Sequence, residues 1–183
     1  VKPISLDRIS AYIQSIKTAE TDFTQVNADG TLSYGRIFMH RPGRARFEYE
    51  PPEQTLVLVG GGKVAIFDAK ATEQAEEYPL RRTPLNLILG RKIDLEEAKM
   101  VVGHESDGFT TSVIAQDPKR PEYGTIRLIF SDNPLTLRQW IVTDEYGYET
   151  AVLLGPFEEG KDYPPSMFSV RRELDQRNPR RDD

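Results

Sequence analysis

Side chains that could do chemistry are few and scattered in this sequence. It has two histidines, His40 and His104, and no cysteine. A metal site needs several ligands that the fold brings together, and the histidines show no ligand-like spacing. The lack of cysteine excludes disulfides and thiolate ligands. We therefore interpret both histidines as surface or strand-end residues and expect neither a metal site nor a cofactor.

Three further patterns could suggest catalysis, and each has a simpler explanation. The run GGGK at residues 60–63 fails as a phosphate-binding loop, because Val57 replaces the first glycine and Val64 the Ser/Thr of GxxxxGK[ST]. It is predicted to be a flexible hairpin turn. The carboxylates at positions 48, 50 and 53 could form an acid pair, but they fit the solvated face of a strand better. No serine lies in a nucleophile elbow, so we predict no enzyme.

The composition indicates one globular domain. The chain has 183 residues, of which 38% are hydrophobic, a low value for a compact core but above the disordered range. Its net charge of -5 argues against nucleic-acid binding, which leaves a basic excess. No apolar run approaches the roughly 18 residues that span a bilayer. The sequence starts at Val1, which fits either a removed N-terminal signal or an arbitrary boundary.

Hydrophobic periodicity predicts a helix over residues 5–18. Leu6, Ile9, Ile13 and Ile16 recur at spacings of three and four, so they form one apolar stripe. After this helix the period changes to two, which is typical of strands. Hairpin turns are predicted at Asp29-Gly30, at residues 60–62, at Asp107-Gly108 and at residues 131–134. About ten short strands at this spacing indicate an antiparallel meander.

The stretch RRTPLNLILGRKIDLEEA, at residues 81–98, interrupts the strand pattern. Thr83 can cap a helix, Pro84 fits its first position and Gly90 can end it. This short helix is apolar on most sides, so it must be buried against something. The sequence thus predicts an α+β protein with a large sheet that curls. Either the helices cover an apolar pocket or they complete a plain core without a cavity, and periodicity alone does not decide between these alternatives.

Several segments, taken in order, resemble a known family. They are FTQ at residues 23–25, GRIFMHRPGRARFEY at 35–49, Gly62-Lys63 before an apolar strand, Glu73-Gln74, and TPLNLILG at 83–90. The ordered set resembles the periplasmic outer-membrane lipoprotein carrier, the LolA family, over roughly residues 5 to 170. No single segment is specific, whereas their order is.

The resemblance implies a fold and a function. The fold is an unclosed antiparallel β-barrel of about ten to eleven strands, covered by short α-helices that form a lid over a hydrophobic cavity. We expect one carrier domain over residues 1–170 and a charged, frayed tail over 171–183. The function implied is a periplasmic carrier with a cleaved signal peptide, which binds the acyl chains of lipoproteins released by an inner-membrane ABC transporter. It delivers them at the outer membrane, in many bacteria to a lipoprotein receptor. We expect a monomer that performs no chemical step.

The resemblance also implies site residues. An arginine in the family's Arg-Pro motif, here Arg41, hydrogen-bonds the lid when it is closed. We expect its partners around Thr83 to Gly90, with Thr83 and Leu85 as latch residues, and on the first helix. Strand alternation then predicts which side chains face the lipid. The predicted lipid-binding residues are Ile37, Met39, Ala45, Phe47, Tyr49, Leu56, Leu58, Ile66, Leu87 and Ile88. For any one of them, plain core packing is an equally good explanation.

Two other functions remain open at this point. The first is a LolA-like module that binds a different lipid or senses mislocalised lipoproteins, although such sensors usually have a second domain. The second is an enzyme on the same fold, which would need a clustered polar site that the sequence does not show.

Overall fold

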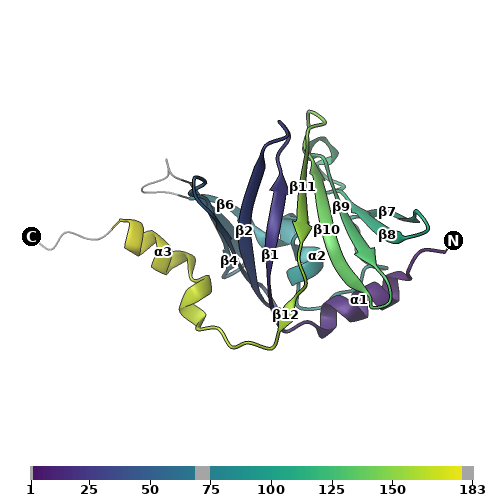
Figure 1. Ribbon diagram of the computed structural model, residues 1–183, viewed down its shortest axis with the longest axis horizontal. Coiled ribbons are helices and arrows are strands. Elements are labelled where there is room, and N and C mark those ends of the chain that lie inside the picture. The colour runs from purple at the N-terminus through teal and green to yellow at the C-terminus, as the bar shows by residue number, and fades with distance from the viewer. Residues whose placement is uncertain (1, 69–74, 179–183) are drawn as a thin grey trace, which may run out of the picture.

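The computed structural model describes residues 2–68 and 75–178. Glu73 and Gln74, used in the family resemblance, lie outside the described residues. Within them, one antiparallel sheet of twelve strands curls around two helices on its concave side (Figure 1). The strands are β1 (Thr18–Val26), β2 (Leu32–His40), β3 (Arg44–Tyr49), β4 (Leu56–Gly60), β5 (Lys63–Phe67), β6 (Glu76–Pro79), β7 (Val101–Ser106), β8 (Thr110–Ala115), β9 (Thr125–Ser131), β10 (Thr136–Thr143), β11 (Glu149–Leu154) and β12 (Glu158–Glu159).

The strand order shows an open barrel. Neighbouring strands run in the order β6-β5-β4-β3-β2-β1-β11-β10-β9-β8-β7, and β12 pairs with the start of β1. The first strand therefore joins the two halves of the meander, and the edge strands β6 and β7 do not pair with each other in the described part of the chain. This arrangement confirms the predicted unclosed antiparallel barrel, with one more strand than expected.

The predicted hairpin turns are confirmed. β1 and β2 are joined at Gly30 (φ 87°) and β7 and β8 at Gly108 (φ 96°). These positive φ values favour glycine, because a Cβ atom clashes with the backbone there. The glycine run after β4 also forms a turn, which pairs Val57 with Ile66 and Val59 with Val64.

The first helix, α1 (Leu6–Ser15), packs across the concave side of β8 to β10. The Ser5 hydroxyl caps it by accepting a hydrogen bond from the amide of Arg8. The predicted stripe is buried, since Ile9 and Ile13 are almost inaccessible to solvent. The ring of Tyr12 contacts that of Phe130 edge-on, with centroids 6.3 Å apart.

The mid-chain interruption forms η1 (Leu80–Arg82), a short 3-10 helix, and then α2 (Asn86–Leu89). The prediction that Thr83 caps this helix is wrong. The Thr83 hydroxyl instead donates to the carbonyl of Leu80, and α2 begins three residues later. α2 lies within the curve of the sheet (Figure 1).

The C-terminal segment differs from the expected frayed tail. After a short 3-10 helix, η3 (Pro165–Phe168), the chain forms α3 (Val170–Arg177). Val170 and Leu174 pack on the convex side of the sheet, and the guanidinium of Arg177 lies 4.7 Å from the ring centre of Phe67. Two apolar side chains four residues apart suffice to dock a helix on a sheet, but they are too few to give a clear sequence period. Residues 179–183 lie outside the described residues.

Candidate functional site

The concave face of the sheet and α2, which we call the lid helix after the lid that the family resemblance implies, enclose a small apolar cavity. Its lining consists of Ile37, Met39, Ala45, Phe47, Leu85, Ile88, Leu89, Leu137, Trp140, Leu154 and Phe157. All eleven side chains are apolar. The cavity has a volume of about 20 Å³, which is room for about one water molecule. The side chains of Leu85, Ile88 and Leu89 therefore fill most of the space between α2 and the sheet.

Strand register explains why the residues from β2 and β3 meet in this cavity. Ile37 lies directly opposite Phe47, and Met39 lies opposite Ala45. These positions alternate with outward ones, as the pleat requires. Tyr49 lies on the same face but further along it, where its ring contacts Phe23 with centroids 5.1 Å apart. The structure thus brings four of the predicted lining residues together and places Tyr49 beside them.

Leu56 and Leu58 were assigned to the wrong face. Val57 pairs with Phe47 and Val59 with Ala45, so the valines of β4 face the concave side. Leu56 and Leu58 project to the convex side, where they pack with Phe67 under α3. A one-residue error in register reverses every side chain of a strand. A double proline interrupts the chain between β3 and β4. The alternation of side chains in β3 therefore does not predict which side chains of β4 face the concave side.

The remaining predicted lining residues divide between the cavity and its surroundings. Ile88 lines the cavity. Ile66, directly opposite Val57, belongs to the concave face but stands outside the cavity and is partly buried. Leu87 is buried on the other side of α2, in a hollow that it shares with Ile93 and Leu95.

Several lining residues were missed by the sequence analysis. Trp140 and Leu154 come from β10 and β11, which β1 joins to the first half of the sheet. Alternation within each strand could have placed them on one face. Only the pairing of β1 with β11, which puts Phe23 opposite Leu154, shows that this face continues that of β2.

Arg41 lies at the end of β2 and binds the two helices together. Its guanidinium donates to the carbonyls of Ile88 and Gly90, both at 2.7 Å, at the end of α2. It also donates to the carbonyls of Ile16, at 3.0 Å, and Gln14, at 3.3 Å, at the end of α1. The residue as a whole is 7% exposed. A single planar guanidinium thus satisfies backbone acceptors at the ends of two helices.

The electrostatics of this contact favour a cation. The last carbonyls of a helix lack partners within the helix and carry partial negative charge. No carboxylate forms an ion pair with Arg41 among the described residues. Burial lowers the pKa of Arg41 from its ordinary value. Arginine nevertheless stays charged at neutral pH, because its ordinary pKa exceeds 12.

Arg41 bonds to both regions predicted to hold its partners, residues 83–90 and the end of the first helix, but not to the two latch residues named in the first of these regions. Neither Thr83 nor Leu85 bonds to the guanidinium; Leu85 lines the cavity instead. The side chain of Gln14 on α1, which was not predicted as a latch residue, forms a second tie. Its amide donates to the carbonyl of Arg91 at 3.1 Å and accepts from the amide of Ile93 at 2.8 Å. α1 thus holds the chain that follows the lid.

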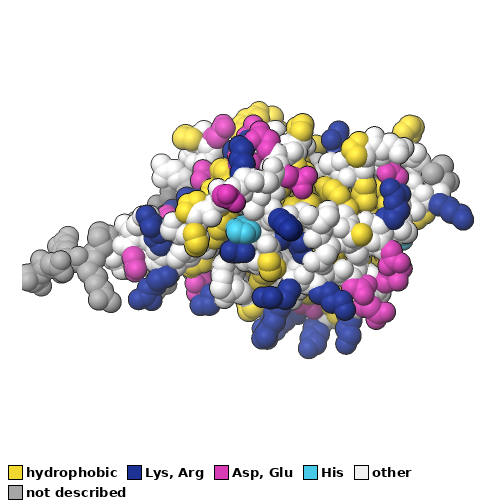
Figure 2. Space-filling model, turned by 90° about the horizontal axis from the view of Figure 1, so that it is seen from below, with side chains coloured by type: hydrophobic (Ala, Val, Ile, Leu, Met, Phe, Trp, Pro, Cys, Tyr) yellow, Lys and Arg dark blue, Asp and Glu magenta, His cyan; other side chains and the backbone are white. Residues whose placement is uncertain are grey.

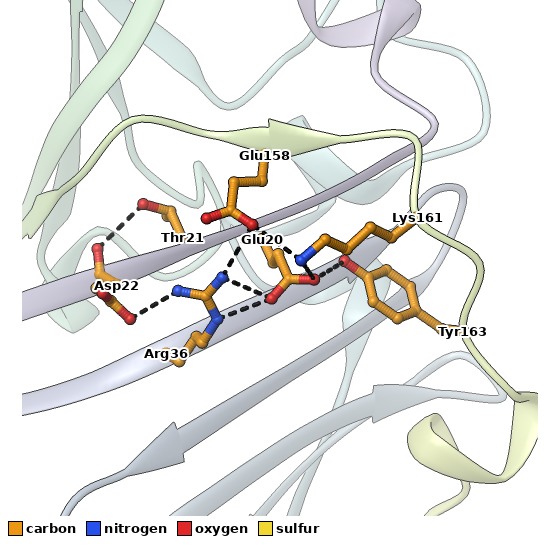
Figure 3. A network of polar contacts seen from close by, with 7 residues as sticks. All are labelled: Glu20, Thr21, Asp22, Arg36, Glu158, Lys161 and Tyr163. Atoms are coloured by element: carbon orange, nitrogen blue, oxygen red, sulfur yellow. Dashed lines mark hydrogen bonds and ion pairs between the residues drawn. The ribbon is translucent and has the colours of Figure 1, made fainter.

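A polar network lies on the convex side, where β12 meets β1 (Figure 3). The Glu20 carboxylate, with 7% of its side chain exposed, pairs with Arg36 at 2.6 Å and Lys161 at 3.2 Å. Burial alone would raise the pKa of Glu20, but hydrogen bonds from Arg36, Lys161 and Tyr163 outweigh it and lower the pKa. Burial and the hydrogen bond to Glu20 raise the pKa of Tyr163 to about 12. This network attaches the C-terminal segment to the sheet and lies on the face opposite the cavity.

The described residues hold neither of two other kinds of site. Across residues 2–68 and 75–178 there is no cluster of three or more His, Cys, Asp or Glu side chains that could hold a metal ion. In the same residues, no helix combines the length and apolarity needed to cross a membrane.

Comparison with known proteins places the chain in a family. The family model described as "Outer membrane lipoprotein carrier protein LolA" matches residues 14–171. The outer-membrane lipoprotein carrier protein of Chromobacterium violaceum is 29% identical over 175 residues, which cover 88% of this chain and 81% of that protein. The protein of the same description from Chromohalobacter salexigens is 28% identical over 174 residues, covering 89% and 80%.

A solved structure shares the fold. The crystal structure of an uncharacterized conserved protein from Thermus thermophilus has a TM-score of 0.51 at 10% identity, and covers 89% of each chain. At that identity the likeness concerns the fold alone. Because the family model spans most of this sequence, the chain belongs to the LolA family of outer membrane lipoprotein carrier proteins.

Proposed function

We propose that this protein carries lipoproteins by enclosing their acyl chains between the concave face of the sheet and the lid. The observation that supports this role most strongly is the cavity itself, whose eleven lining side chains are all apolar. It is closed by a short segment whose Ile88 and Leu89 are buried in the core, whose carbonyls Arg41 holds through hydrogen bonds, and which contributes no strand to the sheet. Such a segment can move without unfolding the sheet.

The energetics of acyl transfer require such a movement. Each methylene group removed from water contributes about 0.8 kcal/mol, so a chain of about fifteen methylenes gains roughly 12 kcal/mol on burial. The closed cavity of about 20 Å³ cannot hold such a chain. Leu85, Ile88 and Leu89 occupy the space that the chain would take, so binding must displace the lid.

The pathway is inferred from relatives. Proteins of this family that resemble the chain are described as outer-membrane lipoprotein carriers. We infer that this protein acts in the periplasm, as a monomer, after removal of a signal peptide. It would take acylated lipoproteins from an inner-membrane lipoprotein-releasing ABC transporter and deliver them at the outer membrane, where a lipoprotein receptor could accept them.

The proposal is tested by capture of cargo. Spheroplasts that release lipoproteins into medium containing the purified protein should yield a complex in which an acylated lipoprotein co-elutes with it. Arg41→Leu should change uptake or delivery while the fold persists, and Ala45→Phe, which fills the cavity, should prevent capture. If other lipids co-elute and acylated lipoproteins never do, the protein is a LolA-like lipid-binding or lipoprotein-sensing protein instead.

A further inference from the structure

Four basic residues flank the lid helix, two on each side. Arg81 and Arg82 precede it, and Arg91 and Lys92 follow it. All four are exposed, and none forms an ion pair with a carboxylate among the described residues. Figure 2 shows Lys and Arg side chains gathered along the lower edge of the face seen from below. We call these four residues the basic lid cluster.

The cluster stands out against the charge of the chain. The whole sequence carries a net charge of -5, yet no acidic residue occurs between positions 81 and 92. In the sequence, Glu76 and Glu77 precede this stretch, and Asp94, Glu96 and Glu97 follow it. Lys92 borders a hollow with Asp94 and Glu97 but pairs with neither. The cations therefore remain available for an external anion.

The backbone of the lid segment is hydrogen-bonded to the rest of the protein at both ends. Its apolar side chains and its basic side chains therefore take separate positions. The amide of Leu80 donates to the carbonyl of Gly62 at 2.9 Å, and the carbonyl of Arg91 accepts from Gln14 at 3.1 Å. Between these anchors, Leu85, Ile88 and Leu89 enter the cavity. α2 has only four residues and is roughly 6 Å long, and eight residues in all separate Arg82 from Arg91.

This pattern fits the surface of a lipid bilayer. An apolar segment bordered by arginine and lysine lies well at a membrane interface, with its cations at the headgroups and its apolar side chains below them. Opening the lid exposes the side chains that filled the cavity, which is unfavourable in water. A bilayer gives them another apolar environment, and arginine binds phosphate groups through paired hydrogen bonds.

We propose that the basic lid cluster docks the protein on anionic phospholipid headgroups and that this docking favours the open lid. The inference rests on the proposed acyl-binding role of the cavity. Docking turns the cavity toward the bilayer, so an acyl chain can pass between the two apolar environments with little exposure to water. The same contact favours closure again when the protein leaves the surface.

Vesicle binding tests the proposal. The protein is mixed with vesicles of phosphatidylglycerol and phosphatidylcholine, or of phosphatidylcholine alone, and the bound fraction is measured by sedimentation. Each cation near an anionic surface contributes about fivefold to partitioning. Arg81→Gln with Arg82→Gln, and separately Arg91→Gln with Lys92→Gln, should each lower binding to the anionic vesicles roughly 25-fold. High salt should abolish this binding, because it screens exposed charges.

Lid opening has its own readout. Trp140 is the only tryptophan of the sequence and lines the cavity beside the lid. Its fluorescence should change when the wild-type protein meets anionic vesicles and should not change with phosphatidylcholine alone. Binding without a change at Trp140 would overturn the coupling of docking to opening.

A matched control separates the cluster from overall charge. Arg171→Gln with Arg172→Gln removes the same charge from α3, which lies far from the lid (Figure 1), and should leave vesicle binding unchanged. An equal loss in this control, or no binding by the wild type, overturns the proposal. If soluble polyglutamate binds as well as the vesicles do and produces the same change at Trp140, the cluster recognises an acidic protein instead.

The proposed function can fail independently. Binding of a soluble acylated peptide without vesicles should be the same in the wild type and in both double variants. If the wild type binds vesicles but no acylated peptide, the proposed function fails while docking stands. If it binds the peptide but no vesicle, docking alone fails.

Discussion

Replacing Arg41 by leucine should release the lid while the sheet stays folded. The guanidinium makes two hydrogen bonds of 2.7 Å to α2, at the carbonyls of Ile88 and Gly90. A hydrogen bond to a charged group contributes about 1.5–3 kcal/mol, and such contributions are not strictly additive. Taking the lower value for each bond, the closed lid loses about 3 kcal/mol relative to the open one. Since 1.4 kcal/mol corresponds to a factor of ten, the open population should rise roughly a hundredfold.

Amide hydrogen exchange measures this change residue by residue. The amides of Leu87 to Gly90 are protected by bonds to carbonyls of residues 84–86, all within the lid segment. In Arg41→Leu they should exchange roughly a hundredfold faster, because a four-residue helix that leaves the sheet is too short to stay folded in water. Amides of β1, in the centre of the sheet, should change little, because they exchange only when the barrel itself opens.

Two variants serve as controls for the latch. Arg44→Leu makes the same change three residues along the chain, where the arginine forms no ion pair among the described residues and lies outside the latch, and should leave exchange unaltered. Arg41→Lys keeps the charge but cannot reach the four carbonyls with one planar fork, so its lid should exchange at an intermediate rate. Unchanged protection of the lid amides in Arg41→Leu would refute the latch.

Three further predictions concern the two faces of the sheet. Leu58→Ala should lower the free energy of unfolding by about 2–5 kcal/mol, because Leu58 is fully buried under the C-terminal segment, and urea denaturation measures this loss. The affinity for an acyl peptide should stay unaltered, which would support the place of Leu58 on the convex side. Ala45→Phe should abolish acyl-peptide binding, measured by fluorescence, and retained binding would show that the chains lie elsewhere. The pKa of Glu20 is lowered in the folded protein, so its ion pair stabilises the fold above the ordinary pKa of glutamate and this contribution disappears as the pH falls through the lowered pKa. The stability difference between the wild type and Glu20→Gln should therefore shrink on acidification, and a difference that stays constant with pH would argue against the network.

Much of the fold is determined by the sequence through local rules. The switch from a period of three to four to a period of two separates α1 from the strands, and Gly30 and Gly108 mark turns whose positive φ few other residues tolerate. The order of segments between residues 23 and 90 was enough to indicate the family. The alternation around Arg41 also placed Ile37, Met39, Ala45 and Phe47 on one face. Each of these features depends on residues close together in the chain.

The tertiary structure decided what depends on distant contacts. Leu56 and Leu58 face outward because β4 pairs with β3 in a register that no local pattern specifies across the prolines at positions 51 and 52. α3 forms because the convex side offers an apolar patch from β4 and β5 to two of its side chains.

Arg41 finds backbone carbonyls rather than side chains, and every residue type carries a carbonyl, so its partners leave no trace in the sequence. The sequence by itself therefore determined the strands, the family and the latch residue. Only the assembled sheet and its helices decided which groups this arginine holds and which side chains meet the cavity.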